Sequence, residues 1–120
     1  MNLHIETHGF DPTPAISAWV HQEVAIALDR FDAEIRAIDV YLAARRGPGG
    51  GRGLSAAINV FLKRQAPVRI TTVHTDLYCA ISISAKRAEP AVQRSVHKRR
   101  RLQRLELRRL QSNSALTSPA

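Results

Sequence analysis

The sequence predicts an α+β domain, a two-layer sandwich in which a four-stranded sheet carries two helices on one face. Apolar and polar residues alternate in four segments, which is the period of strands buried on one side. In two further segments apolar residues recur every three or four positions, as in amphipathic helices. A chain of 120 residues has room for one hydrophobic core. We therefore expect a single domain over residues 1–111.

The first two predicted elements are a strand over residues 2–8 and a helix over about residues 14–31. Thr13 is a suitable N-cap for this helix, and Pro14 suits its first turn. Trp19 lies at the edge of the apolar stripe. We expect its ring to close the margin of the core, with base stacking as the alternative.

Three more strands are predicted over residues 38–44, 56–62 and 68–72, and short connections arrange them as an antiparallel meander. The first connection is the glycine-rich segment 46–53. It has no Gly-Lys-Ser/Thr after it, so it predicts a mobile hairpin tip and not a nucleotide-binding loop. The second connection is Gln65-Ala-Pro67.

A second helix follows the last strand, with Thr75 or Asp76 placed to cap it. Pro90 lacks an amide hydrogen and clashes with the carbonyl four residues earlier, so we expect a kink or a break there. Helix propensity continues in a basic extension over about residues 91–111. Residues 112–120 have little to bury and are expected to be disordered. The predicted order is β-α-β-β-β-α.

The net charge of +8 is concentrated in the second half of the chain. Residues 1–50 hold four arginines and seven acids, a net charge of −3, whereas residues 51–120 hold fourteen lysines and arginines and three acids, a net charge of +11. This asymmetry focuses a positive field on one part of the surface. Polyanions are the expected partners.

Several function classes are disfavoured. No apolar run approaches the roughly 20 residues that span a bilayer, and the N-terminus does not resemble a signal peptide, so we expect a cytoplasmic protein with no membrane partner. The single cysteine, Cys79, excludes an intramolecular disulfide and a multi-cysteine zinc site. The five histidines show no metal-ligand spacing. No metal, cofactor or small-molecule substrate is expected.

The candidate RNA contacts are cationic side chains, mostly on the second helix. Helical spacing brings six of them near one another on a solvent-facing side: Lys86, Arg87, Arg94, His97, Lys98 and Arg101. Arg99 and Arg100 are further candidates on the same helix. The alternative is a solvated helix face without a ligand. Cations near the two turns are further candidates, with ordinary exposed turn charges as the alternative: Arg45, Arg46, Lys63, Arg64 and Arg69. Tyr78 is a possible stacking residue, although packing of its ring against the sheet is favoured.

The order β-α-β-β-β-α is shared by double-stranded RNA-binding domains and by ribosome hibernation promoting factors, also called ribosomal subunit interface proteins. The local sequence resembles the second group. Asp76-Leu-Tyr-Cys-Ala-Ile81 is similar to the Asp-hydrophobic-Tyr-Ala-Ala-Ile opening of that family's second helix. Asn2-Leu-His-Ile5 and Ile38-Asp-Val-Tyr-Leu42 are similar to its first half. The resemblance covers about residues 1–101 and is to the short form, which lacks a separate dimerisation domain.

This resemblance implies binding of the small ribosomal subunit, through its rRNA, in the channel of messenger and transfer RNA. Idle ribosomes would be silenced in a stress response, without catalysis. Two alternatives remain open. One is a non-ribosomal RNA- or DNA-binding module. The other is a protein-interaction adaptor that uses a helix with Leu102, Leu105 and Leu110.

Three features depart from the family pattern. The segment from Ala25 to Arg30 has one basic residue, where the family's first helix usually ends in lysine-rich sequence. Pro90 falls where the family's helix usually continues. The stretch 98–109 is richer in arginine than usual, and we expect it to compensate by contacting phosphate.

Overall fold

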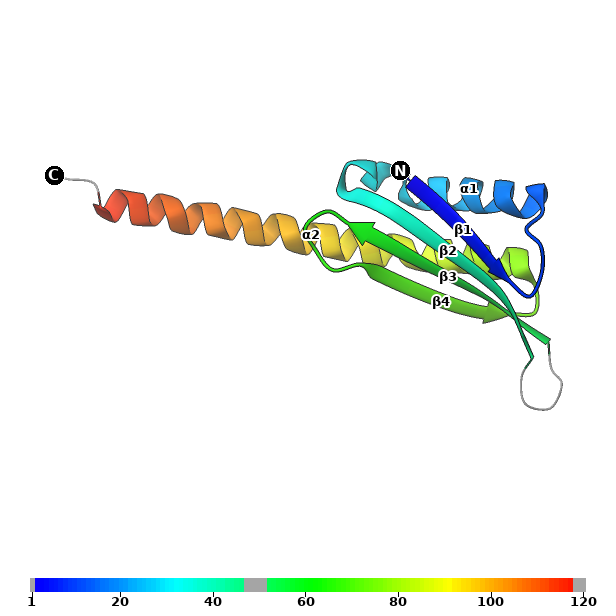
Figure 1. The fold of residues 1–120 in the computed structure, drawn as a ribbon. Helices are drawn as coiled ribbons and strands as arrows, with labels where there is room; N and C mark the ends of the chain where they lie inside the picture. Colours follow the sequence, from blue (N-terminus) through cyan, green and yellow to red (C-terminus); the bar gives the residue numbers. More distant parts are fainter. Residues whose placement is uncertain (1, 47–51, 118–120) are drawn as a thin grey trace.

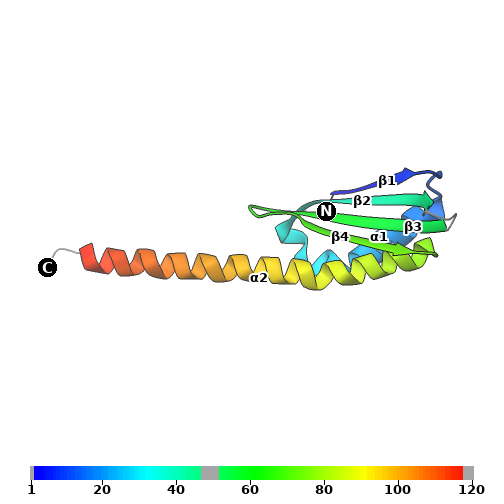
Figure 2. The ribbon, with the colours of Figure 1, turned by 90° about the horizontal axis from the view of Figure 1, so that it is seen from below.

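The structure, a computed structural model, describes residues 2–46 and 52–117. Its elements are β1 (Asn2–His8), α1 (Pro14–Leu28), the 3-10 segment η1 (Asp29–Glu34), β2 (Ile35–Arg46), β3 (Arg52–Leu62), β4 (Val68–His74) and α2 (Leu77–Thr117). The four strands form one sheet, and both helices lie on the same face of it (Figures 1 and 2). The predicted two-layer α+β sandwich is confirmed.

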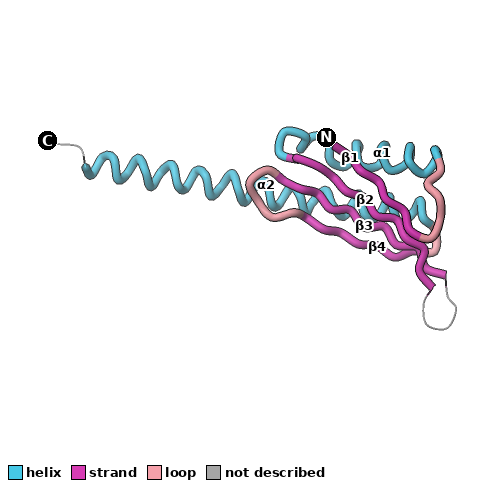
Figure 3. Tube along the Cα trace, in the orientation of Figure 1, coloured by secondary structure: helices cyan, strands magenta, loops and turns pink. Residues whose placement is uncertain are grey.

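The sheet has the strand order β1-β2-β3-β4 (Figure 3). β1 pairs parallel with β2, and Leu3 lies opposite Ile38. The last three strands pair antiparallel, with Val40 opposite Ile58 and Ile58 opposite Ile70. The predicted meander is thus confirmed. The parallel pair follows from the α1 connection, because only a crossover returns the chain in the same direction.

α1 begins where the sequence predicts and ends earlier. The Ile16 amide donates to Thr13 Oγ1 at 3.2 Å, and Pro14 occupies the first turn. The helix ends at Leu28, not at residue 31, because the chain tightens into η1. Phe31 in η1 is still buried. The burial of Phe31 continues the apolar spacing past the end of the α-helix.

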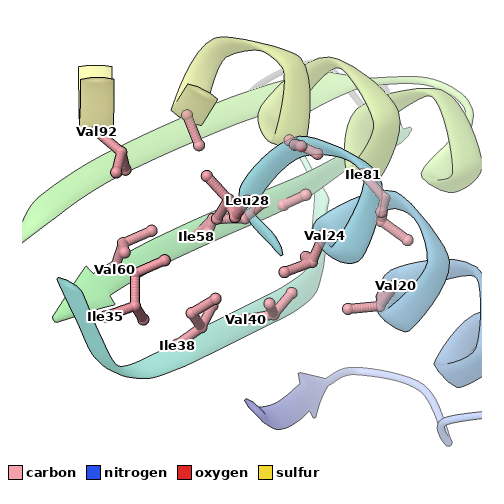
Figure 4. Packing of buried hydrophobic residues seen from close by; sticks show 14 of the residues in the cluster. Val20, Val24, Leu28, Ile35, Ile38, Val40, Ile58, Val60, Ile81 and Val92 are labelled. Atoms are coloured by element: carbon pink, nitrogen blue, oxygen red, sulfur yellow. The ribbon is translucent and has the colours of Figure 1, made fainter. Parts of the chain in front are cut away.

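The hydrophobic core fills the layer between the sheet and the two helices (Figure 4). Its largest fully buried side chains are Val20, Val24 and Leu28 from α1, Ile38, Val40 and Leu42 from β2, Ile58 and Val60 from β3, and Ile81, Val92 and Val96 from α2. Full burial of one such side chain stabilises the fold by about 1.5–3 kcal/mol. The buried hydroxyl of Ser84 donates to the Ala56 carbonyl at 3.2 Å, so this polar group is satisfied inside the core.

Within the described residues, no helix covers the other face of the sheet (Figure 2). Since side chains alternate along a strand, the neighbours of the core residues point to this open face. His4, Asp39, Asn59 and Arg69 lie opposite one another there and form a polar row across all four strands. Arg69 Nε donates to Asn59 Oδ1 at 3.0 Å. The prediction that both helices lie on one face of the sheet agrees with this arrangement.

α2 runs without a break through Pro90. Of the kink or break expected there, the break is therefore wrong, and a kink stays a prediction. A proline inside a helix costs about 3 kcal/mol. Packing on both sides of Pro90 offsets this cost, because Ala88, Val92 and Val96 are all buried against the core. Pro90 and Lys86 lie on the exposed side of the helix. Water can therefore reach the Lys86 carbonyl, which accepts no hydrogen bond from residue 90 because proline has no amide hydrogen.

The helix extends well beyond the sheet and ends at Thr117 rather than at 111 (Figure 1). Adding residues to an existing helix needs no new nucleation, so residues 112–117 can continue it. Residues 118–120, the rest of the tail expected to be disordered, lie outside the described residues. The long axis of the molecule is 76 Å, against 30 and 18 Å in the other directions. None of the helices in the described chain is long and apolar enough to cross a membrane.

Candidate nucleic-acid interface

The start of α2 is fixed by a side-chain cap. Asp76 Oδ1 accepts hydrogen bonds from the amides of Tyr78, at 2.9 Å, and Cys79, at 3.3 Å. His74 Nδ1 in turn accepts from the Asp76 amide at 2.9 Å. Of the two predicted capping residues, Asp76 therefore caps the helix. The cap sets the rotation of the first turn and, through it, which side chains face away from the sheet.

The side of α2 opposite to the core carries a line of basic residues. These residues follow one another at the helical spacing of three or four, except that Pro90 stands between the first two. They are Lys86, Arg94, His97, Arg101, Arg104 and Arg108, here called the cationic stripe. All of them are exposed, as expected for the side opposite to Val92 and Val96. The stripe covers 22 steps of helix, or about 33 Å at 1.5 Å per residue.

A shallow hollow of about 680 Å³ follows the middle of this stripe. It is lined by Pro90, Gln93, Arg94, His97, Lys98, Arg100, Arg101 and Arg104. No described acidic side chain lines it, and neighbouring like charges on a helix repel by roughly 0.2–0.5 kcal/mol per pair. A bound polyanion would remove this repulsion. The hollow is open and strongly basic, which suits phosphate groups better than a small neutral molecule.

Three of the predicted contact residues are engaged within the protein. Arg87 donates to the Thr71 carbonyl at 2.9 Å and to Thr72 Oγ1 at 3.2 Å, along the edge of β4. Arg99 donates to the Arg64 carbonyl at 2.6 Å. Arg100 pairs with the Glu34 carboxylate. These three arginines hold α2 to the sheet and the turns, which leaves the cationic stripe and Lys98 to face solvent.

The predicted turn residues do not form one surface with the stripe. Lys63 and Arg64 lie in the β3–β4 turn beside the point where α2 leaves the sheet. Arg69 lies on the open face, away from the helices. Arg45 and Arg46 end β2 at the opposite end of the sheet from that turn. Among the turn residues whose side chains the structure describes, Lys63 and Arg64 are placed to extend the basic surface of α2.

Arg104 and Arg108 were not named singly as candidates, although they lie in the stretch 98–109 that was expected to contact phosphate. Their signal is the spacing of three or four residues that starts at Arg94 and continues through Arg101. The continuous helix α2 places Arg104 and Arg108 on the same face as Arg94 and Arg101.

The aromatic candidates have a structural role. The Tyr78 ring meets Trp19 edge-on, with ring centroids 5.8 Å apart, so the ring packs against α1. Trp19 Nε1 donates to the Tyr78 carbonyl and to Ser82 Oγ, both at 3.2 Å. The prediction that Trp19 closes the core margin agrees with these contacts. Tyr78 is 41% exposed, and base stacking by its ring stays a prediction. The thiol of Cys79 is free and exposed.

The fold and the stripe together define a class, that of small α+β domains whose second helix is strongly basic on its outer side. A family profile described as "Sigma 54 modulation protein / S30EA ribosomal protein" matches residues 3–100. The chain belongs to this family of ribosome-associated proteins. The resemblance to the ribosome hibernation factors is thereby confirmed. The match ends at residue 100, so most of the projecting part of α2 lies outside it.

Two solved structures are similar to the chain. The N-terminal domain of Protein Y from Thermus thermophilus is 29% identical, with a TM-score of 0.66, over 78% of this chain and 98% of that one. A ribosomal subunit interface protein from Coxiella burnetii is 16% identical, with a TM-score of 0.68, over 81% of this chain and 99% of that one. The second likeness is one of fold. A comparison with curated protein sequences finds no match.

Proposed function

We propose that the chain silences idle ribosomes by binding small-subunit rRNA in the channel that messenger and transfer RNA otherwise occupy. The observation that carries this proposal is the cationic stripe, whose first half, from Lys86 to His97, lies within the residues that match the family. The chain acts as a binding protein in the cytoplasm, where its partner is found, and uses no cofactor. Translation is inhibited because the protein occupies the channel, and no chemical step is involved.

Phosphate contacts need long cationic side chains on a firm support. Lys86 and Arg94 meet this need because α2 is packed against the sheet between them by Ala88 and Val92, both fully buried. Since the stripe carries no Phe, Tyr or Trp, it suits recognition of the backbone and of RNA shape better than base stacking. Structured rRNA offers a dense array of phosphates to such a surface.

Binding to the rRNA should be strongly salt-dependent. A surface that neutralises roughly 6–10 phosphates loses on the order of a thousandfold or more in affinity between 50 and 200 mM salt. Sedimentation of a stationary-phase lysate through sucrose tests this directly. The protein should travel with ribosomes in low salt and be released by high salt. Finding it at the top of the low-salt gradient would refute the proposal.

Charge variants locate the surface. The triple variant K86Q/R94Q/K98Q should weaken binding to purified small subunits and reduce the slope of log affinity against log salt by about 2–3, since each phosphate contact contributes about 0.7–0.9. R94Q compared with R69Q forms a matched pair, because each removes one arginine charge and Arg69 lies on the open face. R94Q should weaken binding and R69Q should not. Equal losses would place the interface elsewhere.

The second candidate, a duplex-binding module that acts away from the ribosome, is favoured by the same feature, a long basic line that can follow the phosphates of a duplex. Competition between whole ribosomes and a short RNA duplex separates the two. Displacement by ribosomes at much lower concentration supports ribosome binding, whereas equal displacement per nucleotide supports the free duplex binder.

A further inference from the structure

The part of α2 from Arg101 to Thr117, here called the arm, projects beyond the sheet (Figures 1 and 2). Every described side chain in it, from Arg101 to Ser112, is exposed. Such a helix has no partner within the described chain, and its arginines continue the stripe that the sheet-packed half of α2 begins. We propose that the arm is a rigid phosphate-binding element, which binds nucleic acid beyond the footprint of the folded domain and in fixed rotation relative to it.

Charge favours nucleic acid over a second copy of the chain. Residues 98–109 hold seven lysines and arginines and one acid, a net charge of +6. Two of the seven, Arg99 and Arg100, are engaged with the body of the protein. The other five face solvent, and packing two arms together would bring these charges close to one another. A polyanion instead neutralises them.

The leucines of the arm do not form a seam for another helix. Leu102, Leu105, Leu107 and Leu110 are each more than half exposed. At about 100° per residue, Leu107 lies about 140° around the helix from Leu102, and the same angle separates Leu110 from Leu105. A coiled coil needs apolar residues on one line at a sustained spacing of 3.5. Here they lie on two sides of the helix, where they can support the stems of neighbouring arginines.

The direction of the arm is set by contacts at its base. Val92 and Val96 are buried against the core. Beyond them, Arg99 bonds to the β3–β4 turn and Arg100 to Glu34 at the end of η1. Since α2 is continuous across this point, the rotation of Arg104 and Arg108 is tied to that of Arg94. The arm therefore presents its arginines on the same side as the domain does.

This inference rests on the proposed function, and helical phasing tests it. Two or four alanines are inserted between Leu102 and Gln103, outside the core. Two inserted alanines rotate Arg104 and Arg108 about the helix axis by about 200°, and four inserted alanines rotate them by about 40°. Binding to purified small subunits and to a 30-base-pair RNA duplex is measured in low salt, with thermal unfolding as a check on folding. The two-alanine variant should lose about tenfold in affinity and the four-alanine variant no more than about threefold.

Point variants complete the design. R104Q/R108Q should lose about tenfold, whereas R109Q, which removes a charge off the line of the stripe, should lose much less. Equal losses from both insertions would overturn the fixed rotation. Unchanged binding by R104Q/R108Q, with a large loss in L102A/L105A, would overturn the nucleic-acid arm in favour of a protein partner. If the wild type binds the duplex with this phasing and not the subunit, the proposed function fails and the arm stands; binding to neither refutes both.

Discussion

Arg100 on α2 forms an ion pair with Glu34, the last residue of η1. The backbone carbonyl of the same glutamate accepts a hydrogen bond from the Lys63 amide at 2.9 Å. Glu34 therefore joins three parts of the structure, η1, the β3–β4 turn and the base of the arm. Arg99 adds a second link between α2 and that turn through the Arg64 carbonyl. The arm leaves the body of the protein at a point held from two sides.

Replacing Glu34 with Gln should have opposite effects on stability and on binding. The free energy of unfolding should fall by less than about 1 kcal/mol, because partly exposed ion pairs contribute little. Affinity for RNA should rise by up to about fivefold, equivalent to about 1 kcal/mol, because a carboxylate leaves the basic surface and Arg100 is freed. Urea denaturation and binding at 50 mM salt measure the two effects. E6Q on β1 is the control, and a fall in affinity for E34Q would contradict the expectation.

Asp76→Ala should destabilise the fold by about 1 kcal/mol, the usual cost of losing an N-cap. The lost bonds are those that Asp76 Oδ1 accepts from the Tyr78 and Cys79 amides. Asp76→Asn keeps an accepting oxygen and should remain close to the wild type in chemical denaturation. If D76N is as harmful as D76A, the negative charge and not the cap is what stabilises the helix.

Val96→Ala should lower the free energy of unfolding by about 2 kcal/mol, from lost burial and the cavity left behind. Val96 is 1% exposed although it lies six positions beyond Pro90. Leu105→Ala is the control, since Leu105 is 53% exposed and its truncation should change stability by less than about 0.5 kcal/mol. Similar values for the two variants would show that packing does not extend past Pro90.

Pro90→Ala should stabilise the protein by about 1–3 kcal/mol. Alanine restores the amide hydrogen to the continuous helix and has the highest helix propensity; the added freedom of the unfolded chain offsets part of this, about 0.4–1 kcal/mol. Thermal unfolding measures the gain, and RNA affinity should stay within twofold. A loss of stability would mean that the surrounding packing depends on the proline ring.

Most of the fold follows from periodicity. Alternation in the strands and three-to-four spacing in the helices give the element order and the buried face, because one face of each element must meet the core. The end of α1 was missed because η1 keeps Phe31 buried, and apolar spacing does not distinguish an α-helix from a 3-10 segment. The break expected at Pro90 followed a local rule that the burial of Val92 and Val96 overrides.

The candidate site was predictable in part. The line of cations from Lys86 to Arg101 follows from helical spacing alone. The position of Arg69 on the open face could also be predicted from the sequence, since Val68 and Ile70 occupy the other side of β4. The contacts that Arg99 and Arg100 make within the protein could not be predicted, because their partners lie 35 and 66 positions away in the sequence. Only the tertiary arrangement separates arginines that hold the helix from those that face solvent.

The projecting helix also acts as a lever. From Val96 to Thr117 it measures about 31 Å at 1.5 Å per residue, so a tilt of about 10° at its base would move its end by about 5 Å, close to one helical turn. Small repacking beneath Val92 and Val96 is therefore amplified at the far end. Substitutions deep in the core, remote from any charged residue, can thus change where the arginines of the arm reach.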